Sequence, residues 1–437
     1  MSGARSSLSE ALRSALGKDR RIAAWQLRSD RSRGLQTYLV KDQMEADRRT
    51  DGETHTVVVF VKNGDMLGRA GITVNPGDAS SVQQKIDQAV YMAGLGGDAP
   101  WALPPASAAS GVEVFDEALA GEKARTTSKS IVAAWRGAVQ AQSGAHPSSM
   151  ELFCGEVEST AANSSGFSAT TRTTRVSMLT LLLAEGERAA ERISWEERRR
   201  ASDLDVGTIV ARVAAEARDL TRAQVPPSGS VPVVIDAQEM TGFLAPVQAN
   251  AGADGLYQKS SRFEIGKPLP IEVKGGEGLT LYSNAIAPYG LQSYAFDDDG
   301  IAGQRVALVE NNVFMRPWAT KQFADYLKVQ PTGAFGNWEI PAGKTPLADL
   351  TRSDGPLLYV RAFSWLTPDP ARGNFGTEIR VGYWFEKGEH RPVKGGTVSG
   401  NVFAALGTAR YSKETVFLGD YLGPSAVRFE GLTVAGA

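Results

Sequence analysis

A short segment rich in proline, glycine and serine, QVPPSGS at residues 224–230, separates two parts of the sequence that have different patterns. In the first part, amphipathic helical segments alternate with strand-like runs, whereas short β-like runs separated by glycine dominate the second part. A chain of 437 residues is also too long for one compact core. We therefore expect an N-terminal domain over residues 1–223 and a C-terminal domain over residues 231–437.

The fold class that these patterns predict is α+β. A helix-containing α/β N-terminal domain should be followed by a largely antiparallel β domain, built as a sandwich or a barrel. In the first part we expect helices over residues 7–17, 82–92, 128–142 and 186–200, a helix beginning at Asp203 or Asp205, and strands over 22–27, 36–40, 54–61, 65–73, 150–159, 167–175 and 176–184. In the second part we expect a strand over 231–236, a helix to about residue 251, and strands over 279–283, 305–310, 357–363, 378–385 and 427–433. Asn63-Gly64 predicts a tight hairpin turn between two of the strands.

Net charge, apolar runs and cysteine count indicate the compartment of the protein and the class of partner it can bind. The formal net charge of −2 gives no overall electrostatic basis for binding nucleic acid or an anionic membrane. The basic run Arg198, Arg199 and Arg200 follows three nearby glutamates in the expected helix 186–200, so we interpret it as a solvated face. No apolar run is long enough to span a bilayer or to serve as the core of a signal peptide. The one cysteine, Cys154, excludes an internal disulfide and suits a reducing compartment, so we expect a cytoplasmic protein.

Residue patterns that would carry catalysis are mostly missing. The three histidines, His55, His146 and His390, have no second histidine or cysteine at metal-ligand spacing, and we interpret them as structural or surface residues. No Gly-x-Ser-x-Gly elbow is present, which weakens a serine-hydrolase interpretation without excluding it. Cys154 has no histidine near it in the sequence and lies in an expected strand, so we assign it to packing.

Two loop segments resemble ligand-binding motifs only in part. Residues 342–345, AGKT, have Trp338 where a phosphate-binding loop needs glycine. Residues 297–300, DDDG, lack the alternating ligands and the distal glutamate of a calcium loop, and they are better interpreted as a hairpin turn. These motifs therefore assign no catalytic residue to the chain.

Several blocks in a fixed order give a more specific signal. They are NSSG (163–166), YQKSSRFEIG (257–266), FDDDG (296–300) with VALVEN (306–311), GYWFEKG (382–388) with PVKG (392–395) and SGN (399–401), and GLTVAG (431–436). In this order the blocks resemble the TldD/PmbA family, and in particular its PmbA-like, or TldE-like, subunits. An interruption at residues 331–337 departs from the compact Thr-Gly-Asn block of that family, so substrate choice is expected to differ.

The resemblance implies a two-domain subunit that pairs with a relative. TldD-like subunits carry His-Glu-x-x-x-His on a helix and a C-terminal cysteine, which together hold a catalytic metal. The matching positions here are 244–249, LAPVQA, and the C-terminal cysteine is missing. Hydrocarbon side chains and amides cannot hold zinc tightly. The resemblance therefore implies a PmbA-like subunit with no catalytic residue and no metal of its own, and zinc is expected in a TldD-like partner.

The function that follows from the resemblance is that of a non-catalytic subunit in a heteromeric metallopeptidase that processes or degrades small or unfolded peptides. We expect a heterodimer with a TldD-like subunit, or self-association, and a peptide substrate that adds as a strand to a sheet edge. Arg316, Asn337, Asn374 and Asn401, each next to glycine or proline, are the candidate substrate-binding residues. Two alternatives stay open: a stand-alone binding or scaffold protein, and a metal-free hydrolase in a specialised biosynthetic pathway.

Overall fold

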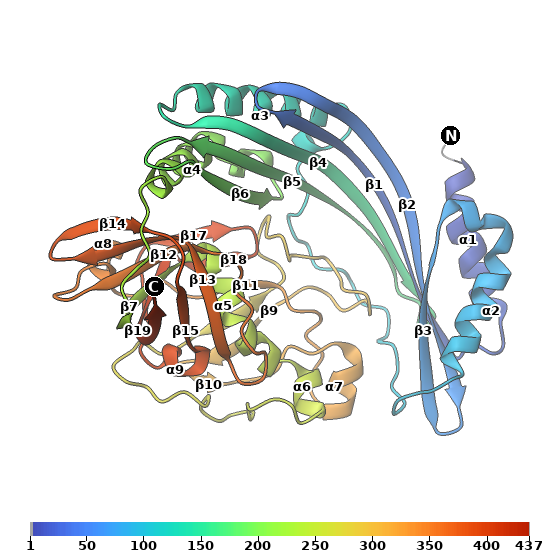
Figure 1. Cartoon of the computed structure of the whole chain (residues 1–437). Helices are drawn as coiled ribbons and strands as arrows, with labels where there is room; N and C mark the ends of the chain where they lie inside the picture. The colour runs from blue at the N-terminus through green and yellow to red at the C-terminus, as the bar shows by residue number, and fades with distance from the viewer. Residues whose placement is uncertain (1–2, 437) are drawn as a thin grey trace.

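The computed structural model describes residues 3–436, and its first part is one large sheet with helices at both ends (Figure 1). Six antiparallel strands follow the order β3-β2-β1-β4-β5-β6, and four of them run for 17 to 21 residues. The sheet curves as an arch over the C-terminal part of the chain (Figure 1). The elements are α1 (Gly3–Lys18), β1 (Ala24–Val40), β2 (Gln43–Asn63), β3 (Met66–Val74), the 3₁₀ turn Pro76–Ser81, α2 (Val82–Ala93), the 3₁₀ turn Glu117–Leu119, α3 (Lys123–Gln140), β4 (His146–Asn163), β5 (Ser168–Ala184), β6 (Ala190–Arg198), the 3₁₀ turn Ala201–Asp203 and α4 (Val206–Leu220).

Two separate apolar clusters fix the helices on this sheet. Helices α1 and α2 pack over one end, and helices α3 and α4 cover the other. Under α3, the buried Trp135 donates a hydrogen bond of 2.7 Å from Nε1 to Thr180 Oγ1. Helix α4 begins where the sequence predicts, since the Asp205 carboxylate accepts a hydrogen bond of 3.0 Å from the Thr208 backbone nitrogen.

The C-terminal part contains a closed barrel beside a second, open sheet. Strands β12, β7, β19, β15 and β13 pair in that order, and the pairing of β12 with β13 closes the ring. The second sheet has the order β10-β9-β8-β11-β18-β17. Among the named strands of residues 3–436, β7–β12 and β11–β18 pair in parallel, and the other pairs are antiparallel. The elements are β7 (Gly229–Asp236), α5 (Ala237–Asn250), α6 (Ala253–Tyr257), β8 (Leu281–Asn284), β9 (Arg305–Glu310), β10 (Val313–Phe314), α7 (Lys321–Leu327), β11 (Asn337–Glu339), α8 (Leu347–Leu350), β12 (Leu357–Phe363), β13 (Asn374–Glu386), β14 (Glu389–Val393), β15 (Thr397–Asn401), α9 (Val402–Leu406), β16 (Arg410–Tyr411), β17 (Thr415–Leu418), β18 (Tyr421–Pro424) and β19 (Ala426–Ala435).

Helix α5 joins the barrel and the second sheet into one core. Phe243 and Leu244, both fully buried, belong to an apolar cluster that includes Val233 of the barrel and Leu308 of the second sheet. The predicted α+β class, with a largely antiparallel and barrel-like second part, is thereby confirmed. The proposed domain boundary at residues 224–230 stays a prediction.

The helix predicted over residues 186–200 is wrong, because residues 190–198 form strand β6. Burial alternates along this strand, with Arg192, Ser194 and Glu196 turned toward the interior. The interpretation of Arg198 to Arg200 as a solvated face is also wrong for Arg199. Its guanidinium is buried and donates hydrogen bonds to three backbone carbonyls of residues 290, 291 and 293.

Smaller differences concern where strands and turns begin. Strands β1 and β5 are each continuous where the sequence predicts two shorter strands. The hairpin after β2 is present, but its turn residues are Gly64 and Asp65, since Asn63 still pairs with Met66. The turn at residues 297–300 is also present, but it connects a single isolated bridge rather than two strands. No helix of residues 3–436 is both long and apolar enough to cross a membrane.

Candidate functional site

The structure brings together two of the four predicted substrate-binding residues. Asn401 Nδ2 donates hydrogen bonds to Asn374 Oδ1 at 2.8 Å and to the Arg372 carbonyl at 2.7 Å. Asn401 Oδ1 accepts from the Ala404 nitrogen at 3.2 Å and thereby caps α9. Arg316 is exposed in the segment after β10. Asn374 and Asn401 thus form a small polar group at one end of the barrel.

Asn337 is in a different environment, because it is fully buried in strand β11. Its Nδ2 donates to the Asn284 carbonyl at 2.6 Å and to Ser293 Oγ at 2.8 Å. Its Oδ1 accepts from the Gln292 nitrogen at 2.9 Å. Both amide hydrogens are therefore already used to hold the second sheet to the loop before β9.

A groove runs along the outer edge of β6, which in the described part of the chain pairs with β5 alone. Its volume is about 330 Å³, and we call it the edge groove. One wall is the whole strand segment 192–198, and the other belongs to the C-terminal part. The lining residues are 192–198, 238, 239, 291, 362, 363 and 418–420. An edge strand with space beside it is the arrangement that accepts a further strand.

The edge of β6 offers both backbone groups and apolar side chains. Ile193 and Trp195 are 42% and 48% exposed and lie on the same face of the strand. The carbonyls of Ile193 and Glu197 accept hydrogen bonds from the side chains of Arg192 and Arg198, respectively. Both carbonyls point outward from the same edge of β6. Backbone groups of alternate residues point to the same side of a strand, so those of Trp195, midway between them, also face this edge.

Glu239 faces the strand from the opposite wall. It lies in the first turn of α5, and its Oε1 accepts a hydrogen bond of 3.2 Å from the Phe363 nitrogen. Burial raises the pKa of Glu239 to about 7, and the nearby Asp236 adds to this effect. Burial also raises the pKa of Asp420, at the end of the groove. The groove thus contains a carboxyl group that can gain or lose a proton near neutral pH.

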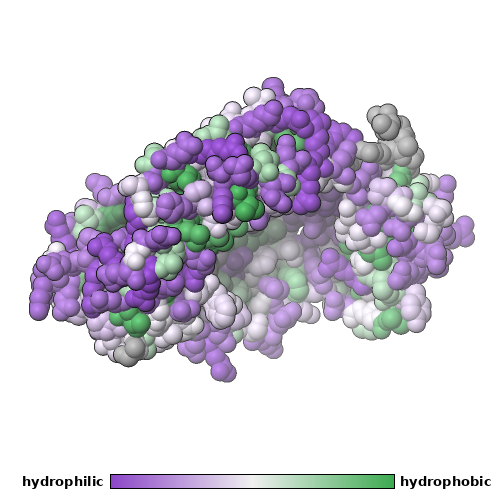
Figure 2. Space-filling view, turned by 45° about the horizontal axis from the view of Figure 1, so that its top comes forward, coloured by the Kyte–Doolittle hydropathy of each residue, from purple (hydrophilic) through white to green (hydrophobic). Residues whose placement is uncertain are grey.

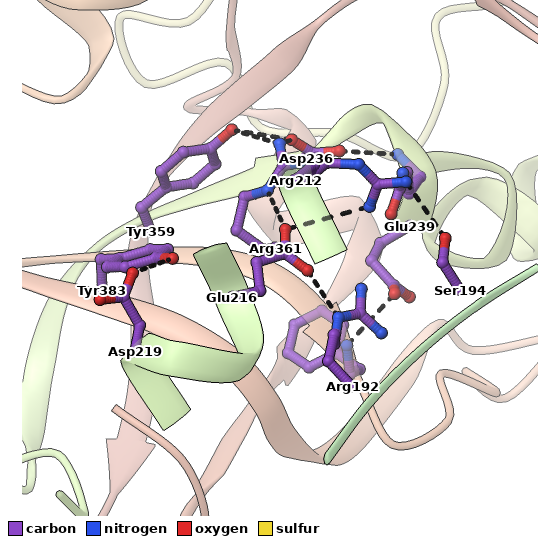
Figure 3. Close-up of polar contacts among 12 residues, drawn as sticks. Arg192, Ser194, Arg212, Glu216, Asp219, Asp236, Glu239, Tyr359, Arg361 and Tyr383 are labelled. Atoms are coloured by element: carbon purple, nitrogen blue, oxygen red, sulfur yellow. Dashed lines mark hydrogen bonds and ion pairs between the residues drawn. The ribbon is translucent and has the colours of Figure 1, made fainter. Parts of the chain in front are cut away.

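A buried polar network fixes this wall relative to β6 (Figure 3). Arg192 of β6 pairs with Glu216 of α4 at 2.5 Å, and Glu216 pairs with Arg361 of β12 at 3.3 Å. Arg361 pairs in turn with Asp236, which also accepts a hydrogen bond of 2.7 Å from the Tyr359 hydroxyl. Asp236 caps the start of α5, so the network sets the position of Glu239.

A larger cavity adjoins the edge groove under the arch, where the surface is hollowed (Figure 2). Its volume is about 580 Å³, and its walls are the concave face of the sheet and residues 293, 294 and 296 of the C-terminal part. Trp195 and Glu197 line both this cavity and the edge groove. An extended molecule in the groove would therefore have access to the space under the arch.

Sequence reasoning missed the edge groove because it assigned β6 to a helix. The alternation of charged and apolar residues in ERISWEE was the available signal for a strand. Glu239 was missed because its environment depends on Phe363 and Asp236, which only the fold brings close.

The side chains of the described chain do not fit a metal site. Within residues 3–436, no three His, Cys, Asp or Glu side chains gather in a way that could hold a metal ion. At the positions that the family resemblance assigns to metal ligands, α5 presents Leu244, Ala245 and Ala249. Cys154 is buried in the first sheet, and burial raises its thiol pKa to about 12, in keeping with its assignment to packing.

The C-terminal part of the chain is similar to known proteins in sequence. Residues 228–436 match the family model of the PmbA/TldA metallopeptidase C-terminal domain. A protein of Methanothermobacter thermautotrophicus named a metalloprotease is 27% identical over 219 residues, which are 46% of this chain and 47% of that protein. Metalloprotease PmbA of Escherichia coli O157:H7 is 26% identical over 183 residues, 39% of this chain and 38% of its own length. The chain thus matches less than half the length of these relatives.

Solved structures match over nearly the whole chain. TldE from Thermococcus kodakarensis has a TM-score of 0.82 at 20% identity, covering 99% of this chain and 100% of that one. A proposed modulator of a DNA gyrase from Thermotoga maritima has a TM-score of 0.79 at 17% identity, covering 98% of this chain and 100% of its own. The chain shares the fold of these proteins, and the predicted resemblance to the TldD/PmbA family is confirmed.

Proposed function

We propose that this chain, whose residues 228–436 match the PmbA/TldA metallopeptidase C-terminal domain, acts as the non-catalytic, TldE-like subunit of a heteromeric metallopeptidase. The observation that carries this proposal is the composition of α5. Leu244, Ala245 and Ala249 occupy the positions at which the resemblance expects two histidines and a glutamate. The chain would then complete the substrate chamber of a TldD-like partner, which supplies the zinc.

The substrates in this proposal are small or unfolded peptides that bind in the edge groove. A peptide lying along β6 would pair with the outward backbone groups of residues 193, 195 and 197. Main-chain pairing depends little on the peptide side chains, so it suits a peptidase that acts on varied unfolded chains. Trp195 and Phe363 would contact apolar side chains on one face of the peptide, and Asn374 and Asn401 stay candidate contacts at the end of the barrel.

The proposed setting is the cytoplasm, and the proposed assembly is a pair of subunits. A single buried cysteine, Cys154, suits a reducing compartment. Ile193, Trp195 and Phe417 are each at least 40% exposed and lie on or near the two sheet edges that border the groove. Apolar side chains of this kind are often covered by a partner subunit.

Activity measurements on the separate subunits and on the pair test the proposal. The TldD-like protein encoded in the same host is purified alone and together with this chain, and each preparation is given an unstructured fluorogenic peptide. We expect cleavage only by the pair, and we expect EDTA to abolish it.

Two outcomes would contradict the proposal: EDTA-resistant cleavage by the isolated chain, and full activity of the partner alone. Peptide binding without any co-purifying partner would instead favour a stand-alone binding protein.

A further inference from the structure

A second polar pocket, far from the edge groove in sequence and sharing no residue with it, lies where α1 meets the first sheet. Its volume is about 340 Å³, and we call it the α1 pocket. The lining residues are 9, 10 and 13 of α1, 29–31 of β1, 53 and 55 of β2, and 158 and 160 of β4. The leucines of α1 pack on the neighbouring apolar part of the sheet, which leaves the polar side of the helix over these residues.

The register of the sheet builds the floor of the α1 pocket. Ser29 of β1 lies opposite His55 of β2, and Arg31 lies opposite Glu53. Residues two apart in a strand share a face, so Ser29 and Arg31 stand side by side, as do His55 and Glu53. A hydroxyl from β1 and an imidazole and a carboxylate from β2 are thereby placed on one face.

Ser29 contacts His55, and His55 in turn contacts Glu53. Ser29 Oγ lies 2.8 Å from His55 Nδ1, within hydrogen-bond distance. His55 Nε2 lies 3.2 Å from Glu53 Oε1, although the contact is too bent for a regular hydrogen bond. His55 is only 1% exposed, and burial lowers its pKa, so the imidazole is neutral at neutral pH. A neutral ring can accept the Ser29 proton at Nδ1 while its Nε2–H faces Glu53.

Arg31 adds a donor to the same pocket. Its Nε is buried and has no hydrogen-bond partner within the described residues, and it lies 3.9 Å from Asp51 Oδ1. A buried donor of this kind is expensive unless a ligand or water satisfies it. A carbonyl oxygen in the α1 pocket could accept from this nitrogen.

We propose that Ser29, His55 and Glu53 form a metal-free acyl-transfer site for small esters. Ser29 Oγ attacks the ester carbonyl, and its proton passes to His55 Nδ1. Loss of the alcohol, which takes the proton from His55, leaves an acyl group on Ser29. Water then attacks this acyl group, gives a proton to His55 and releases the carboxylic acid, with the proton returning to Ser29. Arg31 Nε stabilises the oxyanion, and Glu53 is a positioning residue that acts through His55.

The size and charge of the α1 pocket limit the ester. A volume of about 340 Å³ admits a small acyl ester and not a folded protein segment. The pocket also presents charges of both signs, from Arg13 and Arg31 and from Glu10 and Glu158. Small polar acyl groups are therefore the expected class.

Labelling with a fluorophosphonate-rhodamine probe tests the site directly. The probe should modify the purified full-length chain, and mass spectrometry should place it on Ser29. We expect Ser29→Ala to abolish labelling and His55→Asn to slow it about 100-fold, the usual contribution of a general base. Ser165→Ala, in an exposed turn, is the matched control and should label like the wild type. Absence of label on Ser29 in a chain that is folded by circular dichroism would overturn the proposal.

A pH profile separates the positioning role of Glu53 from a structural one. The labelling rate should rise with pH through the pKa of His55, and Glu53→Gln should move the midpoint to lower pH, because Glu53 favours the protonated ring. An unchanged midpoint would show that Glu53 has no positioning role toward His55. The other charged groups that line the pocket are Glu10 and Arg13 of α1, Asp30 and Arg31 of β1, and Glu158 of β4.

A cysteine variant covers the case in which His55→Asn fails to fold. Ser29→Cys places a thiol against the imidazole, which should favour the thiolate. At pH 6.5 its alkylation by iodoacetamide should be at least 10-fold faster than that of Ser165→Cys, while the buried Cys154 stays unmodified. Equal alkylation rates for the two introduced cysteines would count against an activated residue 29.

Discussion

The Arg192 guanidinium lies 2.5 Å from the Glu216 carboxylate, and both side chains are less than 10% exposed. This ion pair ties β6 to α4, and Glu216 also faces Arg212 and Arg361 at 3.9 and 3.3 Å. One carboxylate therefore neutralises charge from three elements of the fold. The groove wall that β6 forms depends on this arrangement.

Replacing Glu216 should be strongly destabilising. Glu216→Ala leaves Arg192 buried without its partner, and removal of one member of a buried pair costs about 3–5 kcal/mol. Urea denaturation followed by circular dichroism measures the loss in the free energy of unfolding. Glu122→Ala is the matched control, because its pair with Arg49 is exposed and worth at most about 1 kcal/mol. Equal effects of the two variants would contradict the role given to the network.

Glu239 should make stability depend on pH. Its pKa is about 7 in the folded chain against an ordinary value of 4.5, so the folded state binds the proton more tightly than the unfolded state. The unfolding free energy contributed by this group is therefore highest below about pH 4.5 and falls as the pH rises to 7. Glu239→Gln removes the ionisable group and keeps an acceptor for the Phe363 nitrogen.

At pH 8 we expect Glu239→Gln to be more stable than the wild type by up to about 3 kcal/mol, with the difference vanishing at pH 4. Urea midpoints at the two pH values measure this. The pH dependence of wild-type stability alone cannot be assigned to Glu239, because burial also raises the pKa of Asp297 to about 7. The comparison with Glu239→Gln is therefore needed. The exposed Glu389→Gln is the control for the same substitution at a surface position. A Glu239→Gln variant that gains nothing at pH 8 would show that the carboxyl is not destabilising there.

Elements whose sequence pattern is local were predictable. In α4, Val206, Ile209, Val210 and Val213 form an apolar stripe behind the cap Asp205, and the helix lies where these residues indicate. The short strands of the barrel were equally recognisable, because glycine separates them and β-branched residues fill them.

Features that depend on distant partners were not predictable. The charges of β6 suggest a solvated helix until Glu216 and Arg212 are known to lie beside them. Ser29 and His55 become neighbours only through the register of β1 with β2, and their turn at residues 41 and 42 has none of the Asn-Gly chemistry that fixes a register from sequence. Asn337 has flanking residues typical of a loop, but it is buried in a three-residue strand.

Gly343 should not tolerate a side chain. A Cβ atom there would lie 1.9 Å from the Tyr411 carbonyl oxygen, so the two backbone segments would have to separate. We expect Gly343→Ala to lower the free energy of unfolding by about 1–3 kcal/mol or more, as overpacking does. Gly355→Ala is the control, since a Cβ there meets nothing within 4 Å. Thermal melts compare the two, and a harmless Gly343→Ala would show that this close contact is absent in solution.

Peptide binding along β6 should depend on main-chain hydrogen bonds and on Trp195. Fluorescence anisotropy of a labelled unstructured peptide measures the affinity, first for the chain alone and then for the chain mixed with the proposed TldD-like partner. N-methylation of alternate peptide amides should weaken binding about 10-fold, because each amide lost to a strand costs a hydrogen bond and adds a clash. Side-chain substitutions in the peptide should matter less.

Trp195→Ala should weaken peptide binding as well, since the indole lines both the edge groove and the cavity under the arch. Trp365→Ala is the matched control, because Trp365 is 76% exposed and lies outside both cavities. The two substitutions remove the same side chain, so a general loss of apolar surface would weaken binding equally in both. If the peptide binds in the edge groove, Trp195→Ala must lower its affinity more than Trp365→Ala does. The affinity must also depend on which peptide amides are methylated. Equal affinities for the two variants, or an affinity unchanged by N-methylation, would show that the peptide does not bind along β6.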